Sequence, residues 1–189
     1  MRVVEIIPNF SFGLLNGWIY FVFYLIIFIL VLSTCSKEVK KRLYDRSLWD
    51  KKIKIITAIG KLFSFANIIM IFLATIQFGT IEFIIGMVLY SVGLIGLVIA
   101  IINYRNAPLD KPITIGLYKI SRNPQMVMIY IMFAGMILII ASWINLIFLC
   151  ISIICAHFSI LGEEKALTEQ YGELYDNYKT RAPRYFMFF

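Results

Sequence analysis

Apolar residues occur in five long runs that short polar segments separate. The runs cover residues 13–35, 55–78, 81–103, 125–140 and 143–161. An α-helix needs about 20 apolar residues to cross the hydrocarbon core of a bilayer, and most of the runs approach or exceed that length. The pattern predicts an all-α fold, a polytopic membrane bundle of about five transmembrane helices. No repeat or composition break divides residues 1–189, so we expect a single domain.

Short linkers predict which helices are neighbours. Gly79-Thr80 joins the second and third runs, and Ala141-Ser142 joins the fourth and fifth, so each pair forms an antiparallel hairpin. Small residues recur near helical spacing on the third run, where they permit close approach between helix backbones. These residues are Gly86, Gly93, Gly96 and Ala100.

The basic residues lie between the apolar runs. Hydrophobic residues make up 61% of the chain and the formal net charge is +7. In a soluble protein this charge would suggest nucleic acid, but here the positive-inside rule explains it, so we expect no nucleic-acid partner. Residues 36–54 carry eight basic residues against three acidic ones, and residues 104–124 carry four against one. Both segments are therefore expected in the cytoplasm.

Counting five crossings places the C-terminal tail on the same side as these two loops. We expect a multi-pass protein of a prokaryotic plasma membrane with a cytoplasmic C-terminus and a helical extension after residue 161. The first run is long enough to span and no small-residue cleavage site follows it, so it is expected to be retained rather than cleaved as a signal peptide. Residues 1–12 are expected to be an interfacial lead-in.

Two basic features allow more than one interpretation. In the simpler interpretation, the 36–54 segment is a loop that contacts solvent or lipid headgroups. In the more specific interpretation, it forms a binding site for an anionic lipid. Lys61 lies about two turns inside the second run, where snorkelling of its side chain to the headgroups explains it. Cys35, Cys150 and Cys155 have no metal-ligand spacing, and we expect no metal.

The candidate chemistry lies in two polar stretches, Gly116–Met126 and Glu163-Glu164. Pro124 suits the first turn of the fourth helix, which places Arg122 and Asn123 at a positively polarised helix N-terminus that favours a carboxylate or phosphate. A plain N-cap with a snorkelling arginine is the alternative. If the fifth helix continues without a break, one acidic and aromatic stripe extends beyond the membrane, and a juxtamembrane amphipathic helix is its simpler interpretation. The stripe consists of His157, Glu164, Tyr171, Tyr175 and Tyr178.

The order and spacing of several motifs resemble the integral-membrane methyltransferases that include isoprenylcysteine carboxyl methyltransferase and the phospholipid N-methyltransferases. The resemblance covers residues 103–184, which would be the cofactor-binding half. It is carried by Gly116-Leu117-Tyr118, Arg122-Asn123-Pro124, Gly135, Ser142, Glu163-Glu164, Leu167, Tyr171-Gly172, Tyr175, Tyr178 and the stretch from Arg181 to Arg184.

The resemblance implies a cytoplasm-facing site for S-adenosyl-L-methionine and a lipid or lipophilic methyl acceptor. Pro112 and Ile113 would hold the adenine side, and Glu163 or Glu164 would face the cofactor's ammonium, with which a carboxylate pairs well. The remaining cofactor residues implied are Tyr118, Arg122, Asn123, Pro124, Gln125 and Met126.

Catalytic roles follow from the same resemblance. Arg181, Arg184 or Tyr178 would place the reactive end of the acceptor, and Glu164 or His157 would deprotonate an amine acceptor. The chain departs from the family pattern at Asn123 and Met126, where His and Tyr are usual. Asn123 cannot titrate, which excludes proton transfer there. Ser159 stands where an arginine would orient an acceptor carboxylate, which disfavours an isoprenylcysteine substrate.

Two other functions remain open from the sequence. Sterol reductases have a similar C-terminal region and use NADPH, but their pattern continues with an aromatic, Gly and Glu where this chain has Val127, Met128 and Ile129. A non-enzymatic membrane protein is the third possibility. No Gly-rich Rossmann fingerprint is present.

Overall fold

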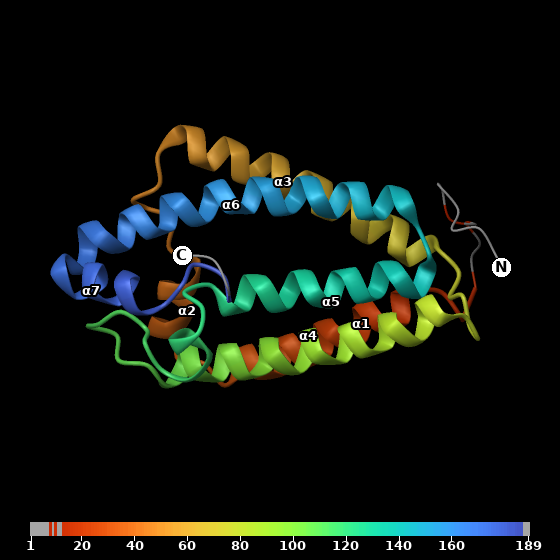
Figure 1. The fold of residues 1–189 in the computed structure, drawn as a ribbon, viewed down its shortest axis with the longest axis horizontal. Helices are drawn as coiled ribbons and strands as arrows, with labels where there is room; N and C mark the ends of the chain where they lie inside the picture. Colours follow the sequence, from red (N-terminus) through yellow and green to blue (C-terminus); the bar gives the residue numbers. More distant parts are fainter. Residues whose placement is uncertain (1–7, 9, 11–12, 187–189) are drawn as a thin grey trace.

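The computed structural model describes residues 8, 10 and 13–186, and these residues form helices and connecting segments. The expected lead-in at residues 1–12 therefore lies almost wholly outside the described residues. Figure 1 shows the elements in chain order. They are α1 (Trp18–Ser33), α2 (Lys37–Tyr44), α3 (Lys51–Leu73), α4 (Ile81–Asn106), the 3₁₀-helix η1 (Gly116–Lys119), α5 (Pro124–Ile140), α6 (Trp143–Tyr171) and α7 (Glu173–Arg181).

Five of these helices correspond to the five apolar runs, which confirms the all-helical membrane fold. In the described part of the chain, α3, α4 and α6 are long and apolar enough to cross a membrane. The apolar helices α1 and α5 are shorter, with 16 and 17 residues. Many large apolar side chains on the outer helix faces are exposed, as expected for contact with lipid.

Local sequence signals set the helix ends. Asp50, Thr80 and Ser142 each accept a hydrogen bond from the backbone N–H three residues later, which caps the start of α3, α4 and α6. Pro124 is the first residue of α5. Ala141 ends α5 in the left-handed region, with φ of 49°, so that the chain reverses within two residues.

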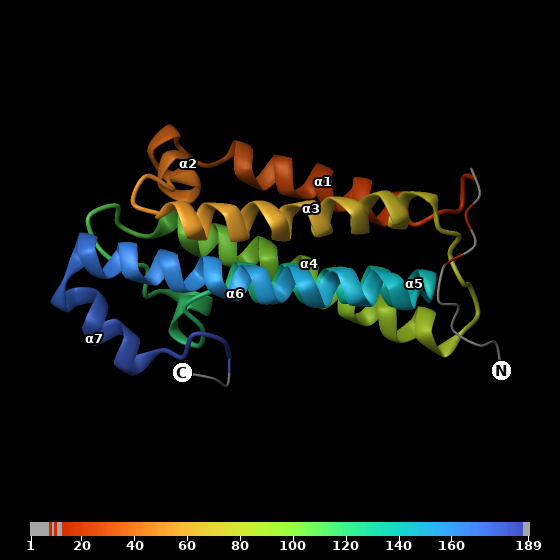
Figure 2. The same cartoon turned by 90° about the horizontal axis from the view of Figure 1, so that it is seen from above.

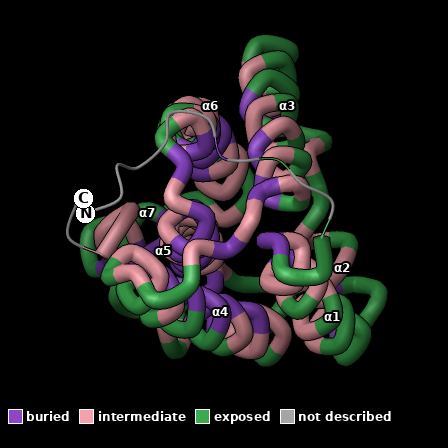
Figure 3. Tube along the Cα trace, turned by 90° about the vertical axis from the view of Figure 1, so that its right-hand side faces the viewer, coloured by how far each residue is buried: buried purple, intermediate pink, exposed green. Residues whose placement is uncertain are grey.

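Two close helix pairs form the bundle. Helices α4 and α5 pack along the predicted small residues, because Gly86 and Gly93 lie against the backbone of α5. Helices α3 and α6 form the second pair, in which the side chains of Asn67 and Asn145 are fully buried against each other. Figure 3 shows that the buried residues lie mainly where α4, α5 and α6 face one another.

The charged segments gather at one end of the bundle. Figures 1 and 2 show α2, η1 and α7 together there, opposite the α3–α4 and α5–α6 turns. We call this region the charged end. It unites the 36–54 segment, the 104–124 segment and the C-terminal segment, which the charge pattern had placed on one side.

The predicted stripe along the fifth helix is only partly correct. Helix α6 does extend ten residues beyond the predicted limit of 161, to Tyr171. It ends there because Gly172 adopts φ of 52° and ψ of −131°, a conformation that L side chains rarely adopt. Tyr175 and Tyr178 consequently lie on α7, a separate helix that folds back toward the bundle (Figure 2).

Candidate functional site

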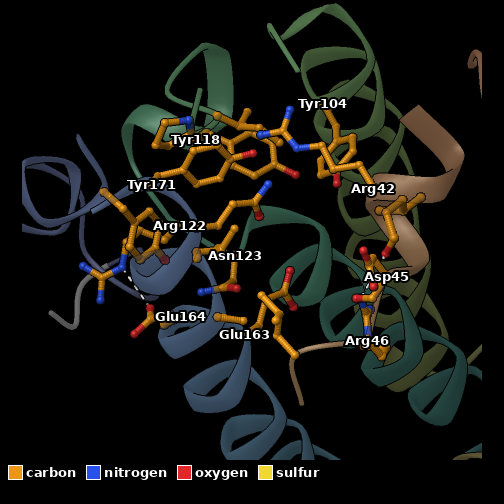
Figure 4. Close-up of a pocket in the computed structure, with 18 of the residues that line it drawn as sticks. Arg42, Asp45, Arg46, Tyr104, Tyr118, Arg122, Asn123, Glu163, Glu164 and Tyr171 are labelled. Atoms are coloured by element: carbon orange, nitrogen blue, oxygen red, sulfur yellow. Dashed lines mark hydrogen bonds and ion pairs between the residues drawn. The ribbon is translucent and has the colours of Figure 1, made fainter. Parts of the chain in front are cut away.

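A cavity of about 430 Å³ lies at the charged end. Its walls come from α2 and the segment after it, the end of α4, the loop before η1, the start of α5, the end of α6, and α7. Figure 4 shows the labelled side chains that these elements direct into it. Small-molecule sites in proteins have volumes of about 300–1,000 Å³, so the cavity suits a ligand of cofactor size.

Arg122 connects the start of α5 to the C-terminal segment. Its backbone N–H donates to the carbonyl of Pro183 over 2.8 Å, and its Nη1 donates to the carbonyls of Ala182 and Lys179 over 2.7 and 3.0 Å. The Nε atom donates to Glu164 over 2.9 Å. Most of its donors are therefore used within the protein, so Arg122 shapes the wall of the cavity.

Glu164 is held by two arginines. Its Oε1 accepts from Arg122, and its Oε2 accepts from the Nη2 and Nε of Arg184 over 2.8 and 3.1 Å. The hydrogen bond to Glu164 raises the pKa of the Arg184 guanidinium above its ordinary value. The Glu164 side chain is 9% exposed, so two positive groups compensate one buried negative charge.

Glu163 has a different environment although it is the adjacent residue. Successive residues on a helix are about 100° apart, and the carboxylate of Glu163 points toward the centre of the cavity instead of toward Arg122 (Figure 4). Within the described residues Glu163 makes no hydrogen bond or ion pair. Arg46 and Glu164 are the charged groups that act on it electrostatically. Glu163 is thus the carboxylate available to a ligand.

Tyrosines form one wall of the cavity. Tyr104, Tyr118 and Tyr171 line it, and the rings of Tyr104 and Tyr118 are 6.3 Å apart. The hydroxyl of Tyr178 donates to the backbone carbonyl of Tyr118 over 2.6 Å, which holds η1 against α7. Burial raises the pKa of the Tyr118 phenol well above its ordinary value, so it stays neutral. Neutral aromatic surface of this kind suits a flat heterocycle.

Arg42 attaches α2 to the rest of the site. Its Nη1 and Nη2 donate to the carbonyls of Pro108 and Lys111 over 2.7 and 2.8 Å. Its guanidinium also lies 5.5 Å from the ring centroid of Tyr104 and 6.0 Å from that of Tyr171. The basic 36–54 segment is therefore a wall of the cavity as well as a charged loop.

Sequence reasoning did not identify this wall. Arg42, Asp45, Arg46 and Trp49 all line the cavity, but none was a candidate site residue. The sequence did contain one signal that could have indicated it. Ser36 and Asp50 are typical N-cap residues, and they indicate that helices rather than a loop begin in this segment. Trp49 is buried, and the guanidinium of Arg46 lies 4.6 Å from its ring centroid.

The side-chain amide of Gln125 has a buried donor, Nε2. This nitrogen makes no well-formed hydrogen bond, although the side chain lies close enough to the Tyr118 phenol to interact with it. Gln125 lies in the first turn of α5 and lines the cavity. The first backbone N–H groups of a helix also lack partners within the helix. Donors thus converge where α5 begins.

Nine of the ten residues expected to bind the cofactor line the cavity: Pro112, Ile113, Tyr118, Arg122, Asn123, Gln125, Met126, Glu163 and Glu164. Tyr178, a candidate for placing the acceptor, also lines it. Pro124 is buried and begins α5, but it does not line the cavity. Arg181 is exposed on α7 and is not part of the wall. The Nδ1 of His157 lies 2.9 Å from the hydroxyl of Tyr185, outside the cavity.

A second cavity of about 580 Å³ lies between α3, α5 and α6. Its lining is largely apolar, with Ile129, Phe133 and Leu149 among it. Arg46, Trp49, Met126 and Glu163 line both cavities. These four residues therefore form the junction between a polar chamber at the charged end and an apolar chamber within the bundle.

The donors and acceptors of the first cavity fit S-adenosyl-L-methionine. Its ammonium requires a carboxylate, and Glu163 is available. Its own carboxylate requires N–H donors, and Gln125 with the start of α5 supplies them. Its adenine requires flat apolar surface, which Tyr104 and Tyr118 present.

Comparison with known proteins identifies one related group. The family model described as phospholipid methyltransferase matches residues 69–174, which is more than half of the chain. The match covers the whole of α4, α5 and α6, including the start of α5 and both glutamates. Searches with this sequence among curated proteins and among solved structures found no match.

Proposed function

Because this chain belongs to the phospholipid methyltransferase family, we propose that it transfers a methyl group from S-adenosyl-L-methionine to the amine of a membrane phospholipid. The observation that carries the proposal is the position of Glu163. This carboxylate lines both cavities, so it lies where a polar cofactor in the first would meet a lipid in the second.

The first cavity would bind the cofactor through residues of four elements. Glu163 would pair with its ammonium, and Gln125 with the first turn of α5 would bind its carboxylate. Tyr118, together with Pro112 and Ile113, would enclose the adenine. When bound, the cofactor supplies an electrophilic methyl group on a sulfonium.

The residues at the junction would align the acceptor rather than react with it. Methyl transfer from a sulfonium is an in-line displacement, in which the neutral amine would form the new N–C bond as the S–C bond breaks. The proton lost by the amine would pass to water at the junction, so the protein contributes mainly position. Trp49 and Met126 supply apolar surface at the junction. A carboxylate there disfavours an acceptor carboxylate and favours an amine, in agreement with Ser159 standing where a carboxyl-methylating member would have an arginine.

The positions of the other candidates narrow their roles. Glu164 is held in two ion pairs, so we assign it to holding the wall rather than to proton transfer. We assign no proton transfer to His157 and no acceptor contact to Arg181, because both lie outside the two cavities. The excess of basic residues in the segments around α2 and η1 supports a cytoplasmic location for the charged end, where this cofactor is available.

Calorimetry on the full-length protein in detergent tests the proposal. We expect S-adenosylhomocysteine and S-adenosyl-L-methionine to bind, and Glu163→Gln to weaken binding by about tenfold through loss of a charge-assisted hydrogen bond. Glu169→Gln is the matched control, because Glu169 is exposed on the same helix and lines neither cavity. Absence of binding at millimolar concentration, or tight binding of NADPH instead, would overturn the proposal.

A further inference from the structure

One face of α3 carries two lysines toward the second cavity. Lys54, Thr57, Lys61 and Ser64 all line this cavity, and their spacing of three or four residues places them on one side of the helix. The two lysines are seven residues apart, which corresponds to about 10.5 Å along the axis. The lysines are therefore stacked along one wall of an otherwise largely apolar chamber.

The hydroxyl groups on this face already have partners. The Oγ1 of Thr57 lies 2.7 Å from the Oγ of Ser159, and the Oγ of Ser64 donates to that of Ser152 over 3.1 Å. These contacts join α3 to α6. In contrast, the ammonium groups of Lys54 and Lys61 make no hydrogen bond or ion pair with any described residue. The wall thus offers a ligand two cations and no unused hydroxyl.

Snorkelling toward the headgroups would explain a lysine at position 61, but the place of its side chain favours a different role. A lysine within a span commonly extends toward the headgroups, and Lys61 is exposed enough to do so. However, its side chain lines the same cavity as Glu163, and an ionisable group that faces a cavity within a membrane indicates a functional site. The cavity therefore has two lysines along α3, and at its junction the Glu163 carboxylate together with Arg46.

We propose that Lys54 and Lys61 bind the phosphate of the phospholipid acceptor in the second cavity, with its amine directed to the junction at Glu163. The inference rests on the proposed function, which supplies the acceptor class. A phospholipid that carries an amine has a negative phosphate and a positive group a few bonds apart, and the cavity presents the opposite charges in the same order. Flexible four-carbon stems allow both ammonium groups to reach one phosphate.

The apolar part of the chamber agrees with a lipid rather than a free phosphate ester. Ile129, Phe133 and Leu149 line it from α5 and α6, where they would contact acyl chains. A soluble phosphate would gain nothing from this surface. The same chemistry therefore predicts that lipid-borne phosphate binds and inorganic phosphate does not compete.

Binding of phosphatidic acid tests the inference without methyl transfer. Phosphatidic acid has the phosphate and acyl chains but no amine, and diacylglycerol has neither charge. The full-length protein in a maltoside detergent is titrated with each, by native mass spectrometry, in the presence of S-adenosylhomocysteine. We expect saturable binding of phosphatidic acid, little binding of diacylglycerol, and no competition from inorganic phosphate.

Lysine variants then locate the site. Lys61→Ala and Lys54→Ala should each weaken phosphatidic acid binding by about tenfold or more, the loss typical of a charge-assisted hydrogen bond, whereas Lys61→Arg should largely retain it. Lys52→Ala is the matched control, because Lys52 is exposed on α3 but lines neither cavity. Equal effects of Lys61→Ala and Lys52→Ala would overturn the inference, as would competition by inorganic phosphate.

The cofactor measurement separates this inference from the proposed function. S-adenosylhomocysteine affinity should be the same in all four lysine variants and the wild type. If the cofactor binds and the lysines do not matter, this inference fails and the proposed function stands. If no cofactor binds but phosphatidic acid binding still depends on Lys61, the proposed function fails and the phosphate site remains.

Discussion

The Nε of Arg122 donates a hydrogen bond to Oε1 of Glu164 over 2.9 Å, although 42 residues separate them in the chain. The arginine side chain is 5% exposed and the glutamate side chain 9%. The pair joins the start of α5 to the end of α6. It therefore holds in place two of the elements that enclose the first cavity.

Arg122→Ala should destabilise the protein. Removing the single partner of a buried charge costs about 3–5 kcal/mol. The loss for Arg122→Ala should lie at the lower end of this range or below it, because Arg184 still pairs with Glu164. The measurement is unfolding in detergent micelles, followed by circular dichroism. Asp176→Asn is the control, since its pair with Lys179 is largely exposed and such pairs contribute about 0–1 kcal/mol. Comparable losses in both variants would show that the buried pair has no special structural role.

Gln125→Met should have opposite effects on stability and on binding. Without ligand, the variant should be more stable by about 1 kcal/mol, because the buried Nε2 donor makes no well-formed hydrogen bond and only a weak interaction with the Tyr118 phenol is lost. Cofactor affinity should fall by about tenfold, because the same donor is lost to the ligand. Thermal unfolding with and without S-adenosylhomocysteine measures both effects. A variant that is less stable and binds normally would mean that the amide has a structural partner.

Gly93→Ala should destabilise the bundle more than Gly96→Ala. A Cβ at Gly93 would meet the backbone of Met132 and Met128, which cannot move without shifting α5. A Cβ at Gly96 would meet the side chain of Met128, which is flexible and can change rotamer. We expect a loss of about 1–3 kcal/mol for the first and clearly less for the second. Unfolding in detergent compares the two, and equal losses would contradict the assigned contacts.

Tyr178→Phe should loosen η1 and reduce stability by about 1 kcal/mol, because its hydroxyl donates to the carbonyl of Tyr118 over 2.6 Å. Hydrogen exchange at residues 116–121 should increase. Tyr171→Phe is the control, since its hydroxyl lies 3.4 Å from the carbonyl of Leu109 and contributes less. An unchanged exchange rate in Tyr178→Phe would contradict a role in positioning η1.

Burial of the Tyr178 phenol also predicts a response to alkaline pH. Burial raises the pKa of this phenol, so its contribution to stability is complete below the unfolded pKa of about 10 and is lost as pH rises through the folded pKa. Wild-type stability should therefore decline more steeply above pH 10 than that of Tyr178→Phe. Parallel declines would show that the neutral phenol is not specifically required.

Much of the fold followed from residues that are close together in the chain. The length of the apolar runs predicted the long helices, and Pro124 predicted the start of α5. The helical extension expected after residue 161 is present, but it continues α6 as far as Tyr171, and the break at Gly172 was not predicted. This part of α6 is stabilised by packing and by ion pairs from Arg122 and Arg184. Those partners come from other segments, which periodicity does not reveal.

The candidate residues at the start of α5 and the two glutamates line one cavity together, but they do not account for all of its walls. The start of α5 and the two glutamates were recognised because their spacing is a local pattern. Arg42 and Trp49 were missed because nothing near them in the chain indicates that α2 folds over the end of α4. His157 was a candidate because it is the single histidine, but it lies beside Tyr185, outside both cavities.

The sequence by itself determined a helical membrane protein with its charges at one end, because burial of apolar side chains in lipid and capping of helix ends depend on residues near one another in the chain. Only the tertiary structure decided which glutamate is available. Glu163 and Glu164 are chemically identical neighbours, and they differ because Arg122 and Arg184 reach one of them from 42 and 20 residues away.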